Sequence, residues 1–506
     1  MKAHTAQVQR YIIFTVTTMV AILLFSMSTF GAKLQLAGTF EATCDVQFKT
    51  EEVLSFPTKS SIRLSMMPAE EVDIYVLYGR ENLPQEKKTE IRRARPNQTT
   101  IFSLDGLKPD SDYGYQVFCK KPHARIFGER DVHSFRTLRE VTDTFSFAYL
   151  TDTHAYALWS QEASGAGAFN NDFEEFEATR DNLLSDDMVD FVILGGDWSM
   201  PNCSGCQPAT IDGISVSGGS VDSQQETDLR YQKILEQEVL GSLFQETPFV
   251  YVLGDHEGES GWQTSTNLFG LQSRLKYLPN PFSAYRGDTN GRYYTFKTGP
   301  VQIIVIDVLA NTFIKPQIAD DWTLGGEQLA WLQKTLELSD SKWKFIFAEH
   351  LVGGETDALT SNFWKGRGSI KATDDDTPAG IYKGEQAQVD ALMQQYGAQI
   401  FFSGNDHIAS IGEKLNPDGS FATLHVIGGN AGVGASWSSS PDYMAEMTFP
   451  GYSIPSYLTN TIGTKSPGYF RITVNGKDNV LLEYVRTHLN NPTINGTTLF
   501  SYLLEN

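Results

Sequence analysis

Residues 145–154 read FSFAYLTDTH. The first six residues are apolar except for Ser146, which predicts a β-strand buried on both faces. Asp152 and His154 follow directly after that strand. Four later stretches repeat this arrangement, in which an apolar strand ends in carboxylate, amide or imidazole side chains: residues 191–197 (FVILGGD), 249–257 (FVYVLGDHE), 345–350 (FIFAEH) and 400–407 (IFFSGNDH).

Helical patterns lie between these strands, at residues 173–186, 226–244, 327–338 and 385–397. Strands that alternate with helices predict an α/β domain with a mostly parallel sheet. We expect this domain over residues 141–490, followed by a C-terminal tail over residues 491–506. Ligands of such sheets bind beyond the carboxyl ends of the strands, so the five sets of polar side chains are expected to meet in one crevice.

Each of these polar residues has a simpler explanation when it is taken alone. An Asp after a strand often begins a turn or caps a helix, and a single His is usually structural. Their coincidence favours a chemical role, because four of the nine His residues fall at these strand ends: His154, His256, His350 and His407. Carboxylates and imidazoles bind divalent metals. Two ions about 3.5–4 Å apart can hold a phosphoryl group and activate water.

The region before residue 141 has a different pattern. From about Gln35 to Thr137 the sequence shows short strands with alternating polar and apolar residues, which predicts an all-β sandwich over residues 33–140. Tyr113 and Tyr115 follow Leu107-Lys108-Pro109 and look like the tyrosine corner of a fibronectin type III domain. A plain core tyrosine is the alternative.

The first 32 residues predict export. Lys2 and Arg10 precede an apolar run over residues 11–25, and small residues follow it, which is the layout of a secretory signal. An uncleaved membrane anchor over residues 11–30 is the alternative. Either way we expect a secreted, periplasmic or extracellular protein that touches a membrane only through this segment.

The four cysteines agree with export. Cys44 and Cys119 lie in the N-terminal region, and Cys203 and Cys206 lie in a loop rich in Gly and Ser. An even number of cysteines in an exported chain predicts two disulfides. A zinc site at Cys203 and Cys206 is the alternative, but it would need two more soft ligands.

The net charge of −21 bears on the partner. A field of that sign repels the phosphates of nucleic acids, so we do not expect a nucleic-acid polymer as the main partner. A small phosphate ester remains compatible, because bound metal ions dominate the local field.

The order of the motifs resembles that of the calcineurin-like metallophosphoesterases: Asp-x-His, Gly-Asp, Gly-Asp-His-Glu, a lone His, and Gly-Asn-x-His. With a β domain in front that ends in HSFRT (residues 133–137), the layout is similar to that of the purple acid phosphatases. The resemblance covers about Glu51 to Arg486. It implies a four-layer αββα sandwich behind a fibronectin III-like domain, and an exported phosphatase or phosphodiesterase that acts on a small phosphate ester.

The resemblance also implies a centre of two metal ions, expected among Fe, Mn, Zn and Ca. The first ion would be bound by Asp152, His154 and His407. Asp197 would bridge both ions. The residues at the second-ion positions would be Asp255, His350 and Asn405.

The same resemblance implies a catalytic mechanism. A metal-bound hydroxide would attack phosphorus in line. His256 would give a proton to the leaving group or stabilise its charge, and Glu257 would orient His256.

The chain departs from the family pattern in three respects, the first of which involves two residues. Met200 stands where purple acid phosphatases have a metal-binding Tyr, and His154 supplies an imidazole that they lack. Asp255 replaces the usual Asn, and Asn405 replaces a His. The oxygen donors at the second ion favour a harder ion such as Mn, Fe, Ca or Mg over zinc. The alternative is a non-catalytic surface or binding protein that keeps the fold with a weakened second metal site.

Overall fold

The computed structural model of the chain describes residues 43–80, 86–140, 144–154, 170–203, 208–278, 285–314, 322–350, 385–405, 407–416, 418–431, 448–449, 452–453, 458–464 and 466–506. The predicted signal or anchor and Cys206 lie outside these residues. Among the helices of the described residues, none is both long and apolar enough to cross a membrane.

The first large sheet has nine strands. In spatial order they are β26 (Thr498–Glu505), β25 (Asn479–Arg486), β24 (Gly468–Asn475), β9 (Thr144–Leu150), β10 (Val189–Leu194), β13 (Phe249–Tyr251), β1 (Phe48–Ser55), β2 (Ser61–Pro68) and β6 (Thr100–Asp105). β9, β10 and β13 are parallel. Residues 145–150 of β9 are all buried, which explains their almost unbroken apolar run.

The last strand of this sheet lies in the segment that we expected to be a C-terminal tail. β26 pairs antiparallel with β25 over most of its length. Phe500 of β26 is buried and stacks on Tyr484 of β25, with ring centroids 5.3 Å apart. Residues 498–505 are therefore part of the sheet. The contact between the apolar rings of Phe500 and Tyr484 stabilises this strand.

The second large sheet has eight strands. They are, in order, β14 (Arg286–Gly287), β15 (Tyr294–Thr298), β16 (Val301–Val305), β17 (Trp343–Phe347), β18 (Ile400–Ser403), β20 (Phe421–Gly428), β19 (Ala409–Leu415) and β23 (Leu458–Thr464). β16, β17, β18 and β20 are parallel. This is the sheet whose strands end at His350 and at Asn405.

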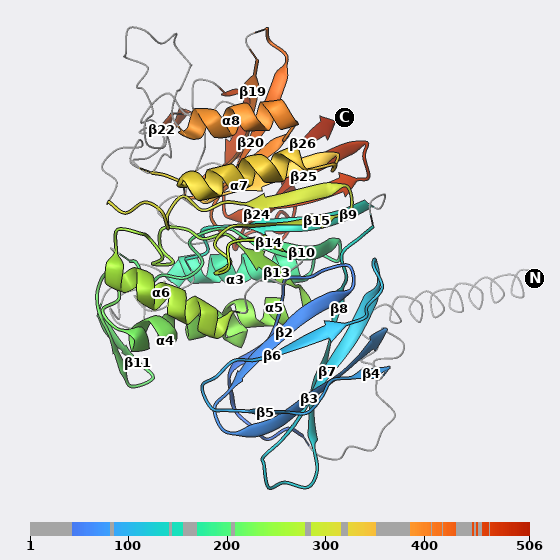
Figure 1. Cartoon of the computed structure of the whole chain (residues 1–506), viewed down its shortest axis with the longest axis vertical. Helices are drawn as coiled ribbons and strands as arrows, with labels where there is room; N and C mark the ends of the chain where they lie inside the picture. Colours follow the sequence, from blue (N-terminus) through green and yellow to red (C-terminus); the bar gives the residue numbers. More distant parts are fainter. Residues whose placement is uncertain are drawn as a thin grey trace, which may run out of the picture.

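The two sheets pack face to face through aromatic side chains. Phe147 of β9 lies 6.3 Å from Phe347 of β17, and Tyr149 of β9 lies 5.5 Å from Phe402 of β18, measured between ring centroids. In Figure 1 the helices α7 (Gly326–Glu337) and α8 (Glu385–Tyr396) lie in the upper half of the molecule, beside strands of the eight-stranded sheet. The helices α3 (Asn170–Leu184), α4 (Gln224–Ile234), α5 (Ser242–Glu246) and α6 (Thr264–Tyr277) lie lower, on the side of β10 and β13 of the nine-stranded sheet. The predicted four-layer αββα sandwich is confirmed.

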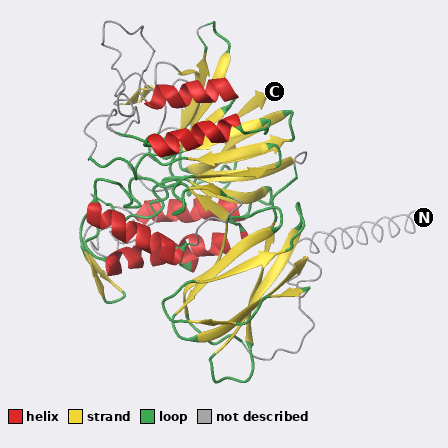
Figure 2. Cartoon of the chain, in the orientation of Figure 1, coloured by secondary structure: helices red, strands yellow, loops and turns green. Residues whose placement is uncertain are grey.

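The N-terminal region is all-β in its described part, as Figure 2 shows. A sheet of β4 (Lys87–Lys88), β3 (Val72–Arg80), β7 (Asp112–Lys120) and β8 (Gly128–Arg136), with β5 (Arg92–Ala94) beside β3, packs on β1, β2 and β6. The Tyr113 hydroxyl accepts a hydrogen bond from the backbone N–H of Lys108 at 2.8 Å, which is the contact expected of a tyrosine corner. Cys44 and Cys119 form a disulfide, and Cys203 is also disulfide-bonded.

The sandwich and the α/β domain share a sheet. Ser55 at the end of β1 pairs in parallel with Phe249 of β13, so that β1, β2 and β6 continue the nine-stranded sheet. The next residue, Phe56, is fully buried, and its ring contacts Tyr251 and Tyr285 of the α/β domain. The N-terminal region is therefore packed against the α/β domain rather than joined to it by a linker alone.

Candidate metal centre

Five of the predicted site residues lie on sharp turns at the ends of β9, β10 and β18. Asp152, His154, Asp197, Asn405 and His407 have φ angles between 41° and 66°, a range in which residues other than glycine are uncommon. A backbone of this kind costs free energy and persists where the surrounding structure fixes it, which is typical of functional sites. The turns bring side chains from both large sheets to one place.

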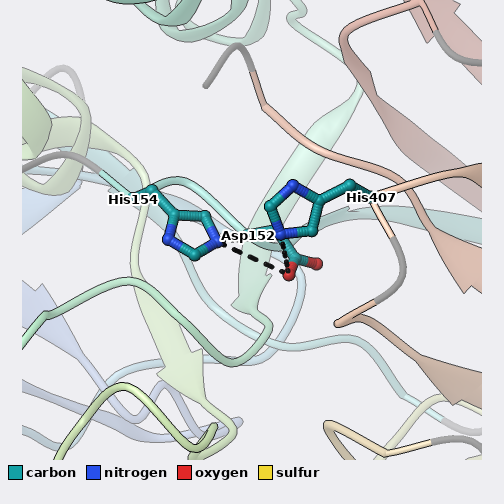
Figure 3. Close-up of side chains that lie close together, drawn as sticks. All are labelled: Asp152, His154 and His407. Atoms are coloured by element: carbon teal, nitrogen blue, oxygen red, sulfur yellow. Dashed lines mark hydrogen bonds and ion pairs between the residues drawn. The ribbon is translucent and has the colours of Figure 1, made fainter. Parts of the chain in front are cut away.

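His154 and His407 lie together beside Asp152 (Figure 3). Their Nε2 atoms are 3.1 Å apart. Oδ1 of Asp152 lies 3.8 Å from Nε2 of His154 and 3.4 Å from Nε2 of His407. Burial lowers the pKa of His154 to about 3 and that of His407 to about 4. Both rings are therefore neutral at pH 7, so their nitrogens can bind a cation.

Asp197 lies between this group and His256. Its Oδ2 is 3.7 Å from Nε2 of His154 and 3.7 Å from Nε2 of His256. Its Oδ1 accepts a hydrogen bond from the backbone N–H of His256 at 3.0 Å. A Cβ atom at Gly254 would lie only 2.4 Å from that oxygen, so a glycine is needed there. The position of Asp197 fits the bridging role that the family resemblance implies.

Glu257 supports the turn that carries Asp197. Its carboxylate accepts hydrogen bonds from the backbone N–H groups of residues 197–199 at 2.8–3.1 Å, and from that of Gly254. Burial raises its pKa to about 8. We expected Glu257 to orient His256, but its described hydrogen bonds go to the backbone, because four N–H groups converge on it. Nδ1 of His256 contacts the backbone oxygen of Asn202 instead.

Glu349 belongs to the centre, although we predicted no role for it. One carboxylate oxygen from each of Asp152, Asp197 and Glu349 lies within 4.8 Å of the others, and all three residues are at most 1% exposed. Gly196 makes room for this side chain, since a Cβ atom there would lie 1.6 Å from Oε2 of Glu349. The available signal was its place directly after an apolar strand and before His350.

The residues predicted for the second ion lie nearby but are less closely grouped. His350 is fully buried against the ring of Trp322, and neither of its ring nitrogens has a hydrogen-bond partner among the described residues. Burial lowers the pKa of His350 to about 4, and the charge of Asp255 partly offsets that effect. Asn405 donates its backbone N–H to both carboxylate oxygens of Asp152 at 3.0 Å. Neither Asp255 nor His350 belongs to the three groups of close ligand atoms found in the described residues.

The sequence of this region also matches a known family. Residues 145–409 match the family described as calcineurin-like phosphoesterase, and this range contains every strand whose end contributes to the centre. The chain belongs to the calcineurin-like phosphoesterase family.

Two solved structures have a similar fold. The structure of PhoD gives a TM-score of 0.65 at 15% sequence identity and covers 93% of this chain and 92% of that chain. The purple acid phosphatase PPD1 from yellow lupin (Lupinus luteus) seeds gives 0.56 at 14% identity and covers 90% and 74%. These identities establish the fold alone. No sequence among the curated proteins is similar enough to count as a match.

The charges in this calcineurin-like phosphoesterase fit bound cations. Burial raises the pKa of Asp152 to about 6. It also raises the pKa of Asp197 well above its ordinary value, with the charge of Glu349 as the next cause. Four buried carboxyl groups share this region, Asp152, Asp197, Glu257 and Glu349, and the half-buried Asp255 lies beside them. Ionisation of Asp152, Asp197 and Glu349 together is unfavourable without cations, and oxygen and imidazole donors without Cys fit Mn, Fe and Zn.

Proposed function

We propose that this chain is an exported hydrolase of small phosphate esters that uses two metal ions. The observation that carries the proposal is the close approach of Asp152, His154, Asp197 and His407, because His154 and His407 are 253 positions apart in the sequence. Chance packing gives no reason for imidazoles and carboxylates from both sheets to face one another inside the protein.

The side chains divide into two sets. Asp152, His154 and His407 would hold the first ion, with Asp197 beside both ions. Asp255, His350, Asn405 and, as an addition from the structure, Glu349 would hold the second. When bound, such ions neutralise the charge of the phosphoryl group and lower the pKa of water.

His256 would act next to these ions. The side chains of His256 and His407 are 23% and 29% exposed, whereas that of His154 is 6% exposed, so an incoming ester can reach the ring of His256. Its Nε2 lies 3.7 Å from Oδ2 of Asp197. We assign to Nε2 the transfer of a proton to the leaving oxygen.

The disulfides support export. Cys44–Cys119 joins residues 75 positions apart, and Cys203 is bonded as well. Disulfides of this kind persist in secreted and periplasmic proteins and are rare in the cytosol. Peptide mapping of protein from its native host without reductant tests this point, and free thiols at Cys44 and Cys119 would count against export.

Hydrolysis of 4-nitrophenyl phosphate and of bis(4-nitrophenyl) phosphate tests the activity. Each substrate is assayed with Mn, Fe, Zn, Ca or Mg, with and without chelator. We expect turnover with at least one metal and none with chelator. Asp197→Asn should lower kcat/KM by roughly a thousand-fold, or ~4 kcal/mol, because it removes the charge between both ions.

Asp307→Asn is the matched control. Asp307 is also a buried strand-end carboxylate, but it accepts a hydrogen bond from the backbone N–H of Leu309 at 2.7 Å and belongs to none of the ligand groups. Equal activity of the two variants would overturn the proposal. Metal binding without any turnover would favour the binding-protein alternative, for which the looser grouping of Asp255 and His350 is the supporting observation.

A further inference from the structure

Asn202 connects the turn after β10 with the loop that carries His256. Its backbone N–H donates to the backbone oxygen of His256 at 3.0 Å. Its own backbone oxygen accepts a hydrogen bond from Nδ1 of His256. Its side-chain Nδ2 donates to the backbone oxygen of Asp255 at 3.0 Å. One residue thus makes three hydrogen bonds to two consecutive residues of the centre.

The surroundings hold Asn202 in place. Its Oδ1 accepts hydrogen bonds from Oγ of Ser220 at 2.7 Å and from Nε2 of Gln263 at 3.2 Å. The next residue, Cys203, is 1% exposed and disulfide-bonded. Asn202-Cys203-Ser204 matches a glycosylation acceptor, but Nδ2 of Asn202 is already engaged with Asp255. The side chain of Asn202 therefore serves the internal structure.

The contact with Asn202 fixes the tautomer of His256. A carbonyl oxygen can only accept a hydrogen bond, so Nδ1 of His256 must carry the hydrogen. Nε2 then faces Oδ2 of Asp197 at 3.7 Å. Glu257 does not take this orienting role in the described structure, since its oxygens accept from four backbone N–H groups.

We propose that Asn202 is a positioning residue that holds His256 so that Nε2 gives a proton to the leaving oxygen of the ester. This inference rests on the proposed function. In the reaction the oxygen of water bonds to phosphorus while the bond to the leaving oxygen breaks. The leaving oxygen keeps that electron pair and takes a proton from Nε2 of the imidazolium form of His256, which leaves a neutral ring with its hydrogen on Nδ1. The proton lost by water passes to solvent, which protonates Nε2 again.

A comparison of leaving groups tests this role. A nitrophenolate leaves without a proton, whereas an alkoxide needs one. Asn202→Ala keeps the backbone oxygen that contacts His256 but removes the side-chain hydrogen bonds to Asp255, Ser220 and Gln263 that hold this oxygen in place. We therefore expect it to lower kcat/KM about ten-fold or more for a methyl ester, and less than about three-fold for the nitrophenyl ester of the same class. His256→Ala should show the same pattern, and adding Asn202→Ala to it should change nothing further. A general disturbance of the fold would instead lower kcat/KM equally for both substrates.

Asn416→Ala is the matched control, because within the described residues the Asn416 side chain donates to Ser420 and Phe421 of its own exposed turn. This variant should leave kcat/KM for both substrates unchanged. The inference would be overturned if Asn202→Ala lowered kcat/KM equally for both esters, or if its loss added to that of His256→Ala in the double variant. In either case the activity of the wild type would still support the proposed function. Absence of wild-type hydrolysis with every metal overturns the proposed function and this inference with it.

A second measurement does not depend on a variant of Asn202 that folds. In protein labelled with 15N-histidine and loaded with a diamagnetic ion such as Zn²⁺ or Mg²⁺, neutral His256 should show a protonated Nδ1 and an unprotonated Nε2. The His256→Ala spectrum assigns the signals. A protonated Nε2 with a bare Nδ1 would contradict the hydrogen bond to Asn202.

Discussion

The Nε2 atoms of His154 and His407 lie 3.1 Å apart, although the two residues are 253 positions apart in the chain. Both rings are neutral at pH 7, because burial lowers the pKa of each. Two neutral imidazole nitrogens at this distance beside the Asp152 carboxylate are suitable ligands for one metal ion.

Removal of either ring should weaken metal binding. We expect His154→Ala and His407→Ala each to lower the affinity for one equivalent of Mn²⁺ or Zn²⁺ by at least about a hundred-fold, since each takes away a direct ligand. Isothermal titration calorimetry and metal analysis after dialysis measure this. His123→Ala changes an exposed His of the N-terminal region and should bind as the wild type does. Unchanged stoichiometry and affinity in both site variants would contradict the assignment.

Metal binding should strengthen as the pH rises through about 6. Burial raises the pKa of Asp152 to about 6, so that below this pH a proton competes with the ion for the carboxylate. In the metal-free protein the folded state holds this proton more tightly than the unfolded state does. The contribution of Asp152 to stability therefore falls as the pH rises from about 4 to about 6.

The measurement is the rise in Tm on adding Mn²⁺. It should be larger at pH 7.5 than at pH 5.0, because the ion removes an unfavourable buried charge only where Asp152 is ionised. Titrations near pH 5.5 in buffers of different ionisation enthalpy should show proton release. The same rise in Tm at both values, with no proton released, would rule out this coupling.

Part of the location of the centre could be predicted from the sequence, because the parallel strands of each sheet end at the same edge. The meeting of the two sheets at this point was implied only by the family resemblance. The apolar runs before Asp152, Asp197 and Asn405 can be recognised in the sequence, and a turn after each run can be inferred from them. The role of Glu257 was not predictable in this way. It depends on backbone N–H groups about 60 positions away that converge on one carboxylate, and no side-chain pattern records them.

Helices were predicted less evenly than strands. The predicted helix over residues 226–244 is interrupted after α4, and a π-helical turn over Gln237–Gly241 precedes α5. α6 was not predicted at all. It contains Gly270 and has no side-chain cap at its start, so its intrinsic helix propensity is weak. Packing against α4 and against the loop after β13 stabilises it instead.

Glu349 should contribute to metal binding rather than to the fold. Glu349→Gln keeps the shape of the side chain but removes a charge and a strong oxygen donor beside Asp152 and Asp197. We expect the affinity for the more weakly bound ion to fall by about ten-fold or more, and the rise in Tm on adding Mn²⁺ to become smaller. Asp307→Asn should keep the rise of the wild type. A full rise in Glu349→Gln would show that its carboxylate does not bind an ion.

The N-terminal sandwich and the α/β domain should unfold together. Phe56 is fully buried where they meet, and its ring centroid lies 5.5 Å from that of Tyr251 and 5.3 Å from that of Tyr285. Phe56→Ala should therefore lower the free energy of unfolding by about 3–5 kcal/mol and shift one calorimetric transition that contains both domains. Phe313→Ala, at a side chain that is 68% exposed, should change it by less than about 0.5 kcal/mol. Two separate transitions, of which Phe56→Ala moves only one, would mean that the shared sheet through Ser55 and Phe249 does not couple the domains.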